Sequence, residues 1–191
     1  MPTPALSICI TATADRYPML AKLLATVDDP AAEVCVSWWG AEPPPVRPPC
    51  ELAGMVGPFC LGRGRNRAAR LARGGVLAFV DADMLLPPAW LQAATAAARA
   101  GSIVAPLYQR LDARGGRVPG AGWGNLVVRA DMWLAAGGYR ETGRYGGEDT
   151  AMINDLKRTH PGLTIVRQEC GLLHQWHTKA TAWHKTDGGA P

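Results

Sequence analysis

Phe79-Val80-Asp81-Ala82-Asp83 decides the fold class of this chain. An apolar run of this length predicts a buried strand, and its two acids come where the strand gives way to a loop. Open α/β sheets bind ligands at this carboxyl edge. Two carboxylates there repel each other unless a cation or several donors lie between them, and Mg²⁺ and Mn²⁺ bind carboxylate oxygens. The pair indicates a divalent metal site, with two acids capping the following helix as the simpler alternative.

Predicted strands and helices alternate around this segment, which is typical of a parallel sheet with right-handed crossovers. No GxGxxG fingerprint follows the first strand and no Walker A motif is present, which argues against dinucleotide and P-loop folds. We expect one α/β domain with a Rossmann-like, mostly parallel central sheet flanked by helices. The predicted strands are 6–11, 33–39, 76–80, 102–107, 124–129 and 164–169, the predicted helices are 15–27, 62–73, 87–100, 131–136 and 148–159, and the loops include 42–49 and 112–120.

Composition limits the classes of protein that this chain can belong to. A length of 191 residues favours one domain, and 48% apolar with 19% charged residues excludes a disordered chain. We see neither an apolar run long enough for a membrane span nor a secretion signal, so a cytoplasmic protein is expected. The five cysteines have no CxxC spacing and are expected to be reduced thiols.

Five arginines are concentrated in one stretch, while the net charge is only +4. Such a stretch suits nucleic acid, a small phosphorylated ligand or a solvated helix face. Because the stretch is short and lies between a glycine-rich turn and an apolar strand, we expect a small ligand and no nucleic-acid partner. The arginines are Arg63, Arg65, Arg67, Arg70 and Arg73.

Two further segments contain residues suited to catalysis or metal binding. Gly146-Gly147-Glu148-Asp149 places two acids at a predicted helix N-terminus, where carboxylates are stabilised; Asp149 suits either a helix cap or a general base. His174 and His177 follow a predicted strand and, together with carboxylates, suit Mn²⁺, although such a pair is more often structural. Three tryptophans suit sugar stacking or core packing: Trp123, Trp176 and Trp183.

Seven segments, taken together and in order, resemble the motifs of GT-A glycosyltransferases. The nearest groups are glycosyltransferase family 2 and the related galactosyltransferase C-terminal-domain group. The resemblance covers nearly the whole chain, from Leu6 to about His177. The segments are 7–16 (SICITATADR), 64–70 (GRNRAAR), 79–83 (FVDAD, a DxD motif), 122–126 (GWGNL), 137–141 (GGYRE), 146–150 (GGEDT) and 173–177 (LHQWH).

The resemblance implies roles for the acids and histidines. Asp83 would be a direct ligand of Mn²⁺ or Mg²⁺, and His174, with His177 as a close second, would complete the protein's share of the metal shell. Asp81 would contact the ribose, or the metal through water.

The resemblance also implies roles in catalysis and donor binding. Asp149 would be the catalytic base of an inverting enzyme, and Glu148 would orient the acceptor hydroxyl. Residues of about 1–85 would form a nucleotide-binding half, about 86–177 an acceptor and catalytic half, and 178–191 a flexible tail or lid. The expected donor-binding residues are Thr11, Thr13 and Arg16 around the nucleoside, Arg65 and Asn66 at the base or diphosphate, and Trp123 and Gly124 beside the sugar.

The activity implied is metal-dependent, inverting transfer of a sugar from a nucleotide-diphosphate sugar, expected to be a UDP-sugar. The acceptor would be a hydroxyl of a small molecule, peptide or glycan. The second strand ends in 36–40 (VSWWG) without the acids that many family 2 members have there, so Trp38 or Trp39 is a candidate to stack on the base, or the two form a buried pair. The alternatives are a metal-dependent nucleotide-sugar phosphohydrolase and a non-catalytic nucleotide-sugar or carbohydrate-binding module.

Overall fold

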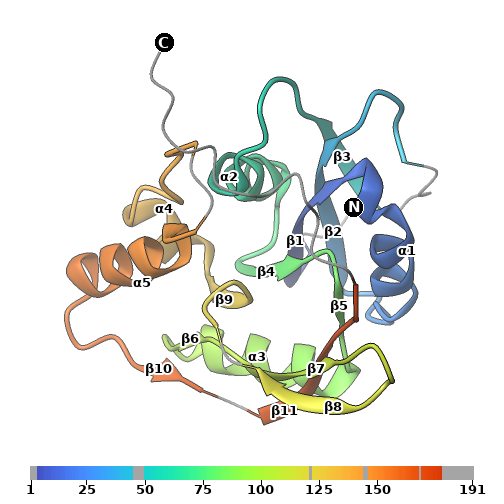
Figure 1. Ribbon diagram of the computed structural model, residues 1–191. Coiled ribbons are helices and arrows are strands. Elements are labelled where there is room, and N and C mark those ends of the chain that lie inside the picture. Colours follow the sequence, from blue (N-terminus) through green and yellow to red (C-terminus); the bar gives the residue numbers. More distant parts are fainter. Residues whose placement is uncertain (1–3, 45–49, 121, 144–145, 168, 178–191) are drawn as a thin grey trace.

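The computed structural model describes residues 4–44, 50–120, 122–143, 146–167 and 169–177 (Figure 1). Its main sheet has seven strands in the order β10-β6-β9-β4-β1-β2-β3. Only β9 runs antiparallel to its neighbours β4 and β6, so the sheet is mostly parallel, as predicted. The strands are β1 (Leu6–Thr13), β2 (Ala32–Trp39), β3 (Cys50–Gly54), β4 (Val76–Asp81), β6 (Ile103–Val104), β9 (Leu126–Arg129) and β10 (Ile165–Val166).

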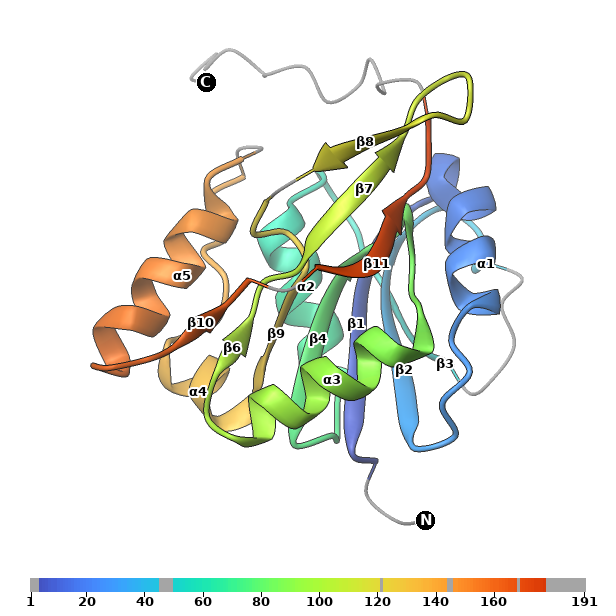
Figure 2. The same ribbon diagram turned by 90° about the horizontal axis from the view of Figure 1, so that it is seen from below.

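Helices cover both faces of this sheet. The helices α1 (Tyr17–Ala25) and α3 (Pro88–Arg99) pack on one face, and α2 (Leu61–Leu71), α4 (Ala130–Ala135) and α5 (Glu148–Thr159) on the other (Figures 1 and 2). A short 3₁₀ turn, η1 (Ala14–Arg16), leads from β1 into α1, which begins with Pro18 in its first turn. The predicted helices are therefore confirmed, with ends shifted by a few residues.

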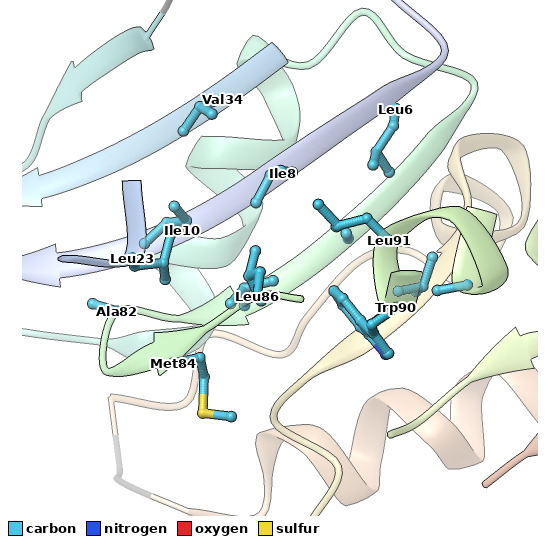
Figure 3. Close-up of a cluster of buried hydrophobic side chains, with 14 of the residues drawn as sticks. Leu6, Ile8, Ile10, Leu23, Val34, Ala82, Met84, Leu86, Trp90 and Leu91 are labelled. Carbon is cyan, nitrogen blue, oxygen red and sulfur yellow. The ribbon is translucent and has the colours of Figure 1, made fainter. Parts of the chain in front are cut away.

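Alternation along the strands explains why the core has two parts. In β1, Ile8 and Ile10 point to the side of α1 and α3, whereas Cys9 points to the side of α2. Figure 3 shows the first cluster, which contains Trp90 and Leu91 of α3 together with Leu6, Ile8 and Ile10 of β1. Both faces of the central strands are thus buried, which explains why 76–80 is continuously apolar.

A second, four-stranded sheet lies beyond the carboxyl ends of the parallel strands, where β7, β8 and β11 gather (Figure 2). It contains β5 (Met84–Leu85), β7 (Leu107–Leu111), β8 (Arg117–Gly120) and β11 (Glu169–His174) in the order β5-β11-β7-β8.

Several sequence predictions were wrong in this region. The predicted strand 102–107 is the separate pair β6 and β7, and the predicted strand 164–169 divides into β10 and the start of β11. The predicted loop 112–120 contains β8, which pairs with β7 after a turn in which Asp112 Oδ1 accepts hydrogen bonds from the backbone amides of Arg114 and Gly116. The strands β3 and β5 were not predicted because neither is rich in β-branched or aromatic residues; both form by pairing with neighbours.

Three other predictions concern the extent of the domain and its surroundings. Among the residues that the structure describes, no helix is both long enough and apolar enough to cross a membrane. The predicted tail or lid, 178–191, lies outside the described residues. The division into two halves near residue 85 stays a prediction.

A buried carboxylate ties the start of the sheet to the end of α2. Glu33 Oε1 accepts hydrogen bonds from Ser7 Oγ (2.6 Å) and from the backbone amides of Arg73 and Gly74. We expect Glu33→Ala to lower the free energy of unfolding by about 2–4 kcal/mol, because it leaves buried donors without an acceptor. Chemical denaturation checks this, with the exposed Glu51→Ala as the control. Equal stabilities of the two variants would contradict this role for Glu33.

Candidate functional site

The DxD segment and the histidine segment are brought together by the pairing of β5 with β11. His174 pairs with Met84, the residue after Asp83, and the backbone amide of Gln175 donates to the carbonyl of Asp83 (2.7 Å). His177 Nε2 lies 3.0 Å and His174 Nε2 3.5 Å from Asp83 Oδ2. One ligand atom from each of these three residues lies within 4.8 Å of the others, which is a spacing that suits one metal ion.

The surroundings of Asp83 favour its charged form. Burial raises the pKa of this carboxyl, but the His177 contact, the charges of His174 and His177 and the nearby Arg16 outweigh burial and leave the pKa below its ordinary value. Arg16 Nη1 lies 3.9 Å from Asp83 Oδ2. The other oxygen, Oδ1, is buried and has no hydrogen-bond partner among the described residues. A buried anionic oxygen without a donor fits a cation ligand.

Arg65 of α2 lies at the centre of a second cluster, which joins the two acidic motifs. Its Nη2 donates to Asp81 Oδ1 (2.9 Å) at the end of β4 and to the carbonyl of Gly124 (3.1 Å) ahead of β9. Its Nη1 donates to Asp149 Oδ1 at the start of α5. The side chain is only 3% exposed, and its guanidinium lies 5.0 Å from the centroid of the Tyr139 ring.

The GGED segment places its two acids in different environments. Gly147 adopts φ +87°, a left-handed conformation that favours glycine, and α5 begins at the next residue. Glu148 is buried, with Oε1 3.8 Å from Arg65 Nη1, whereas the Asp149 side chain is 23% exposed. Burial raises the pKa of Asp149 to about 6; Arg65 opposes the rise, and Asp81 and Glu148 add to it. Asp149 is therefore the more accessible acid and is suited to accept a proton near neutral pH.

Asp81 links the two clusters. Its side chain is 35% exposed, and its backbone amide donates to Asn125 Oδ1 (3.0 Å). Burial raises the pKa of Asp81; Arg65 opposes this and repulsion from Asp83 adds to it. Asp81 thus lies between the Asp83–histidine cluster and the Arg65–Asp149 pair.

Gly124 leaves the space in which these groups meet. A Cβ atom at this position would lie 2.8 Å from Asp81 Oδ2, 3.3 Å from Arg65 Nη2 and 3.5 Å from Asp149 Oδ2. We expect Gly124→Ala to lower the rate of the sugar transfer expected from the sequence about tenfold to hundredfold, because small displacements of reacting groups raise the activation barrier. The control is Gly54→Ala, whose Cβ would meet nothing within 4 Å. Steady-state kinetics and a melting curve check this, and an unchanged rate would contradict the crowding argument.

The predicted nucleoside residues lie at the carboxyl end of β1. Thr11 is buried and accepts a hydrogen bond from Ser37 Oγ (3.2 Å), while Thr13 Oγ1 is buried without a partner among the described residues. Arg16 lies beside Asp83.

Asn66 was predicted to contact the donor, but its amide group bonds to protein. Its Nδ2 donates to the Tyr139 carbonyl and to Glu141 Oε1, and its Oδ1 accepts from the Tyr139 amide, all at 2.8 Å. The side chain is also buried. These contacts fit a role for Asn66 in positioning the GGYRE segment, and its contact with the donor stays a prediction.

The tryptophans differ in their surroundings. Trp38 is a core residue whose Nε1 donates to the Glu42 carbonyl (2.7 Å), so for this residue the buried alternative holds. Trp39, on the other side of the strand, packs its ring against Phe59 and lies below the Arg63 guanidinium.

The candidate sugar platforms also lie in different places. Trp123 is half-buried below the Arg167 guanidinium, at 4.5 Å, and Trp176 is 49% exposed. Trp183 lies outside the described residues. The arginines of 63–73 point to different neighbours, with Arg67 and Arg70 exposed and Arg65 buried.

Three residues of the site were not singled out from the sequence. Asn125 fixes the backbone of Asp81, Gln175 fixes that of Asp83, and Tyr108 of β7 stacks on the His174 ring at 6.1 Å. Gln175 also donates from Nε2 to the Met19 carbonyl (3.1 Å). The polar residues between glycine and apolar positions in GWGNL and between the histidines in LHQWH were the available signals; Tyr108 had none, since its strand was not predicted.

Solved structures with a similar fold include three of one protein, TarS of S. aureus. The fragment 1–349 matches with a TM-score of 0.72 at 14% identity, over 89% of this chain and 60% of that one. The same fragment in complex with UDP-GlcNAc matches with a TM-score of 0.71 at 14% identity, over 92% and 59%. The longer TarS structure matches with a TM-score of 0.71, also at 14% identity, over 90% and 36%. The chain thus spans at most 60% of these proteins, and at this identity the likeness shows the fold, confirming the GT-A architecture.

A comparison with protein-family models shows the family of the chain. No curated protein matches the chain by sequence. The model described as "Glycosyl transferase family 2" matches residues 58–153, just over half of the chain, including the Arg65 helix, the DxD segment and the GGED segment. The chain therefore belongs to glycosyl transferase family 2.

Proposed function

We propose that this chain catalyses metal-dependent, inverting transfer of a sugar from a nucleotide-diphosphate sugar to an acceptor hydroxyl. The observation that carries the proposal is the position of Asp149, half-buried at the start of α5 and joined through Arg65 to Asp81 of the DxD segment. A candidate base thus lies next to the acids expected to face the donor. Family membership supports the same activity.

Asp83, His174 and His177 would hold the divalent cation. The buried Asp83 Oδ1 without a partner among the described residues, and the mixture of carboxylate and imidazole ligands, fit Mn²⁺, with Mg²⁺ as the alternative. When bound, the cation supplies Lewis-acid stabilisation of the charge on the leaving diphosphate. Arg16, 3.9 Å from Asp83, adds a positive charge on the same side.

Asp149 would act on the acceptor. Its carboxylate takes the proton of the acceptor hydroxyl while the acceptor oxygen attacks the anomeric carbon of the donor sugar. The bond from that carbon to the diphosphate oxygen breaks, and the nucleoside diphosphate leaves with the electron pair. A single displacement from the opposite face inverts the anomeric centre, as opposite-face attack does in inverting hydrolases.

The donor is proposed to be a UDP-sugar. The TarS fragment with a similar fold is known in complex with UDP-GlcNAc, which supports a uridine donor. Trp39 lies on the α2 side of the sheet, half-buried, with its ring against Phe59, and is the candidate to stack on the base in place of the missing acid. The acceptor is proposed to be a hydroxyl of a small molecule, peptide or glycan.

The test is a melting-temperature screen against UDP-, GDP- and dTDP-sugars with Mn²⁺ or with a chelator, followed by turnover of any donor that binds. A metal-dependent rise with UDP-sugars, and acceptor-dependent release of UDP with an inverted product by NMR, is the expected result. Hydrolysis of the donor at a rate that no acceptor changes would favour the phosphohydrolase alternative. Binding without turnover, over a broad acceptor panel, would favour a binding module.

A further inference from the structure

Arg65 is a buried cation whose surroundings differ from those of a ligand-binding arginine. Its two terminal nitrogens donate to Asp81, Asp149 and Gly124, which belong to three different parts of the chain. The Tyr139 ring covers the guanidinium at 5.0 Å, and only 3% of the side chain is exposed. A phosphate would reach these nitrogens only by displacing ion pairs that already satisfy them.

We propose that Arg65 is a positioning residue that fixes the Asp149 carboxylate against Asp81, and that it does not bind the donor. The inference rests on the proposed function, in which Asp149 is the base. It replaces the expectation that Arg65 contacts the base or diphosphate of the donor.

The contact with Arg65 gives the two Asp149 carboxylate oxygens different roles. Arg65 Nη1 donates to Oδ1, so Oδ2 remains for the acceptor proton. The same guanidinium holds Asp81 through Nη2 at 2.9 Å, so a rigid planar group fixes one acid relative to the other. A lysine side chain has a single nitrogen and cannot form this fork of two fixed contacts. A lysine at position 65 would therefore keep the positive charge but lose the fixed contact with one of the two acids.

Arg65 also acts on the protonation of Asp149. The charged and titratable groups that face this carboxylate are Arg65 from α2, Asp81 from β4, Tyr139 from the segment before α5, and Glu148 on its own helix. Arg65 favours the ionised carboxylate, while Asp81 and Glu148 disfavour it. Weakening the Arg65 contact should therefore raise the pKa of Asp149 and move the acidic limb of the rate profile to higher pH.

The test compares R65K and R65Q with the wild type, and R67K, an exposed arginine of the same helix, is the matched control. We expect R65K to keep the donor dissociation constant within about threefold, to lose about 100-fold in kcat, and to shift the acidic limb upward. R65Q should shift the limb further, by about one pH unit or more. Melting curves verify that each variant is folded, and R65K, which keeps the charge, suffices where R65Q does not fold.

The outcomes separate this inference from the proposed function. If the wild type is active but the acidic limb of the R65K rate profile is not shifted, the inference is overturned and the proposed function stands. A loss of donor affinity in R65K that equals its loss of kcat/KM has the same consequence and would return Arg65 to donor binding. A wild type without transfer to any acceptor overturns the proposed function, and this inference with it.

Discussion

Asp149→Asn is expected to lower the rate of sugar transfer about 1,000-fold and to leave the affinity for donor and metal within a few-fold. An amide cannot take the acceptor proton, and general-base catalysis contributes about 10²–10⁴-fold. Among the described residues, the group that could hold a metal is Asp83, His174 and His177, so we expect donor and metal binding to depend little on the charge of Asp149. Steady-state rates together with titration calorimetry of donor and Mn²⁺ measure the two effects separately.

The pH profile of the wild type provides an independent check of the same assignment. Because Asp149 must be ionised to act as a base and burial raises its pKa to about 6, the rate should fall about tenfold per pH unit well below pH 6. The exposed Asp28→Asn is the control and should keep both rate and profile. If Asp149→Asn lost donor binding as strongly as transfer, Asp149 would not be the base.

Asp83→Ala is expected to abolish the stabilisation of the protein by donor and Mn²⁺ together. A ligand at about 100 times its dissociation constant stabilises the folded state by about 2.7 kcal/mol, which for a chain of this size is a rise of about 5–10 °C in the melting temperature. The variant loses the carboxylate whose Oδ2 contacts both histidines and whose Oδ1 has no partner in the described part of the chain. Melting curves with and without Mn²⁺ and UDP measure the loss without relying on turnover.

Two controls keep this result interpretable. Asp28→Ala, at an exposed position, should retain the full metal-dependent rise. The wild type with chelator should behave as Asp83→Ala does with Mn²⁺. An unchanged metal-dependent rise in Asp83→Ala would mean that the metal binds elsewhere.

The sequence predicted well those elements that follow from the local pattern of apolar, glycine and acidic residues. The apolar run 76–80 became β4 because both faces of a central strand are buried, and GGED became the start of α5, with Glu148 and Asp149 in the first turn, where carboxylates are stabilised. The helices around them were predicted from their Ala-rich or amphipathic patterns.

Elements that form only through long-range strand pairing could not be predicted from the local sequence. The strands β3, β5 and β8 are short, and β8 includes Pro119, so only their partners make them strands. The same limit applied to Arg65, because the spacing of arginines along 63–73 does not tell which one enters the interior. Gly64, where a Cβ would lie 2.5 Å from Thr11 and 2.8 Å from Trp39, allows α2 to pack closely on the sheet beside the buried Arg65.

The pairing of β11 with β5 has a consequence for how the candidate metal site forms. Both histidines of the candidate metal site come from the last described segment of the chain, and Asp83 lies more than ninety residues earlier. The three candidate ligand atoms come together only when β11 pairs with β5, because this pairing places His174 next to Met84, the residue after Asp83. A chain that ends before β11 would therefore lack both histidines of this candidate site, although it contains Asp83.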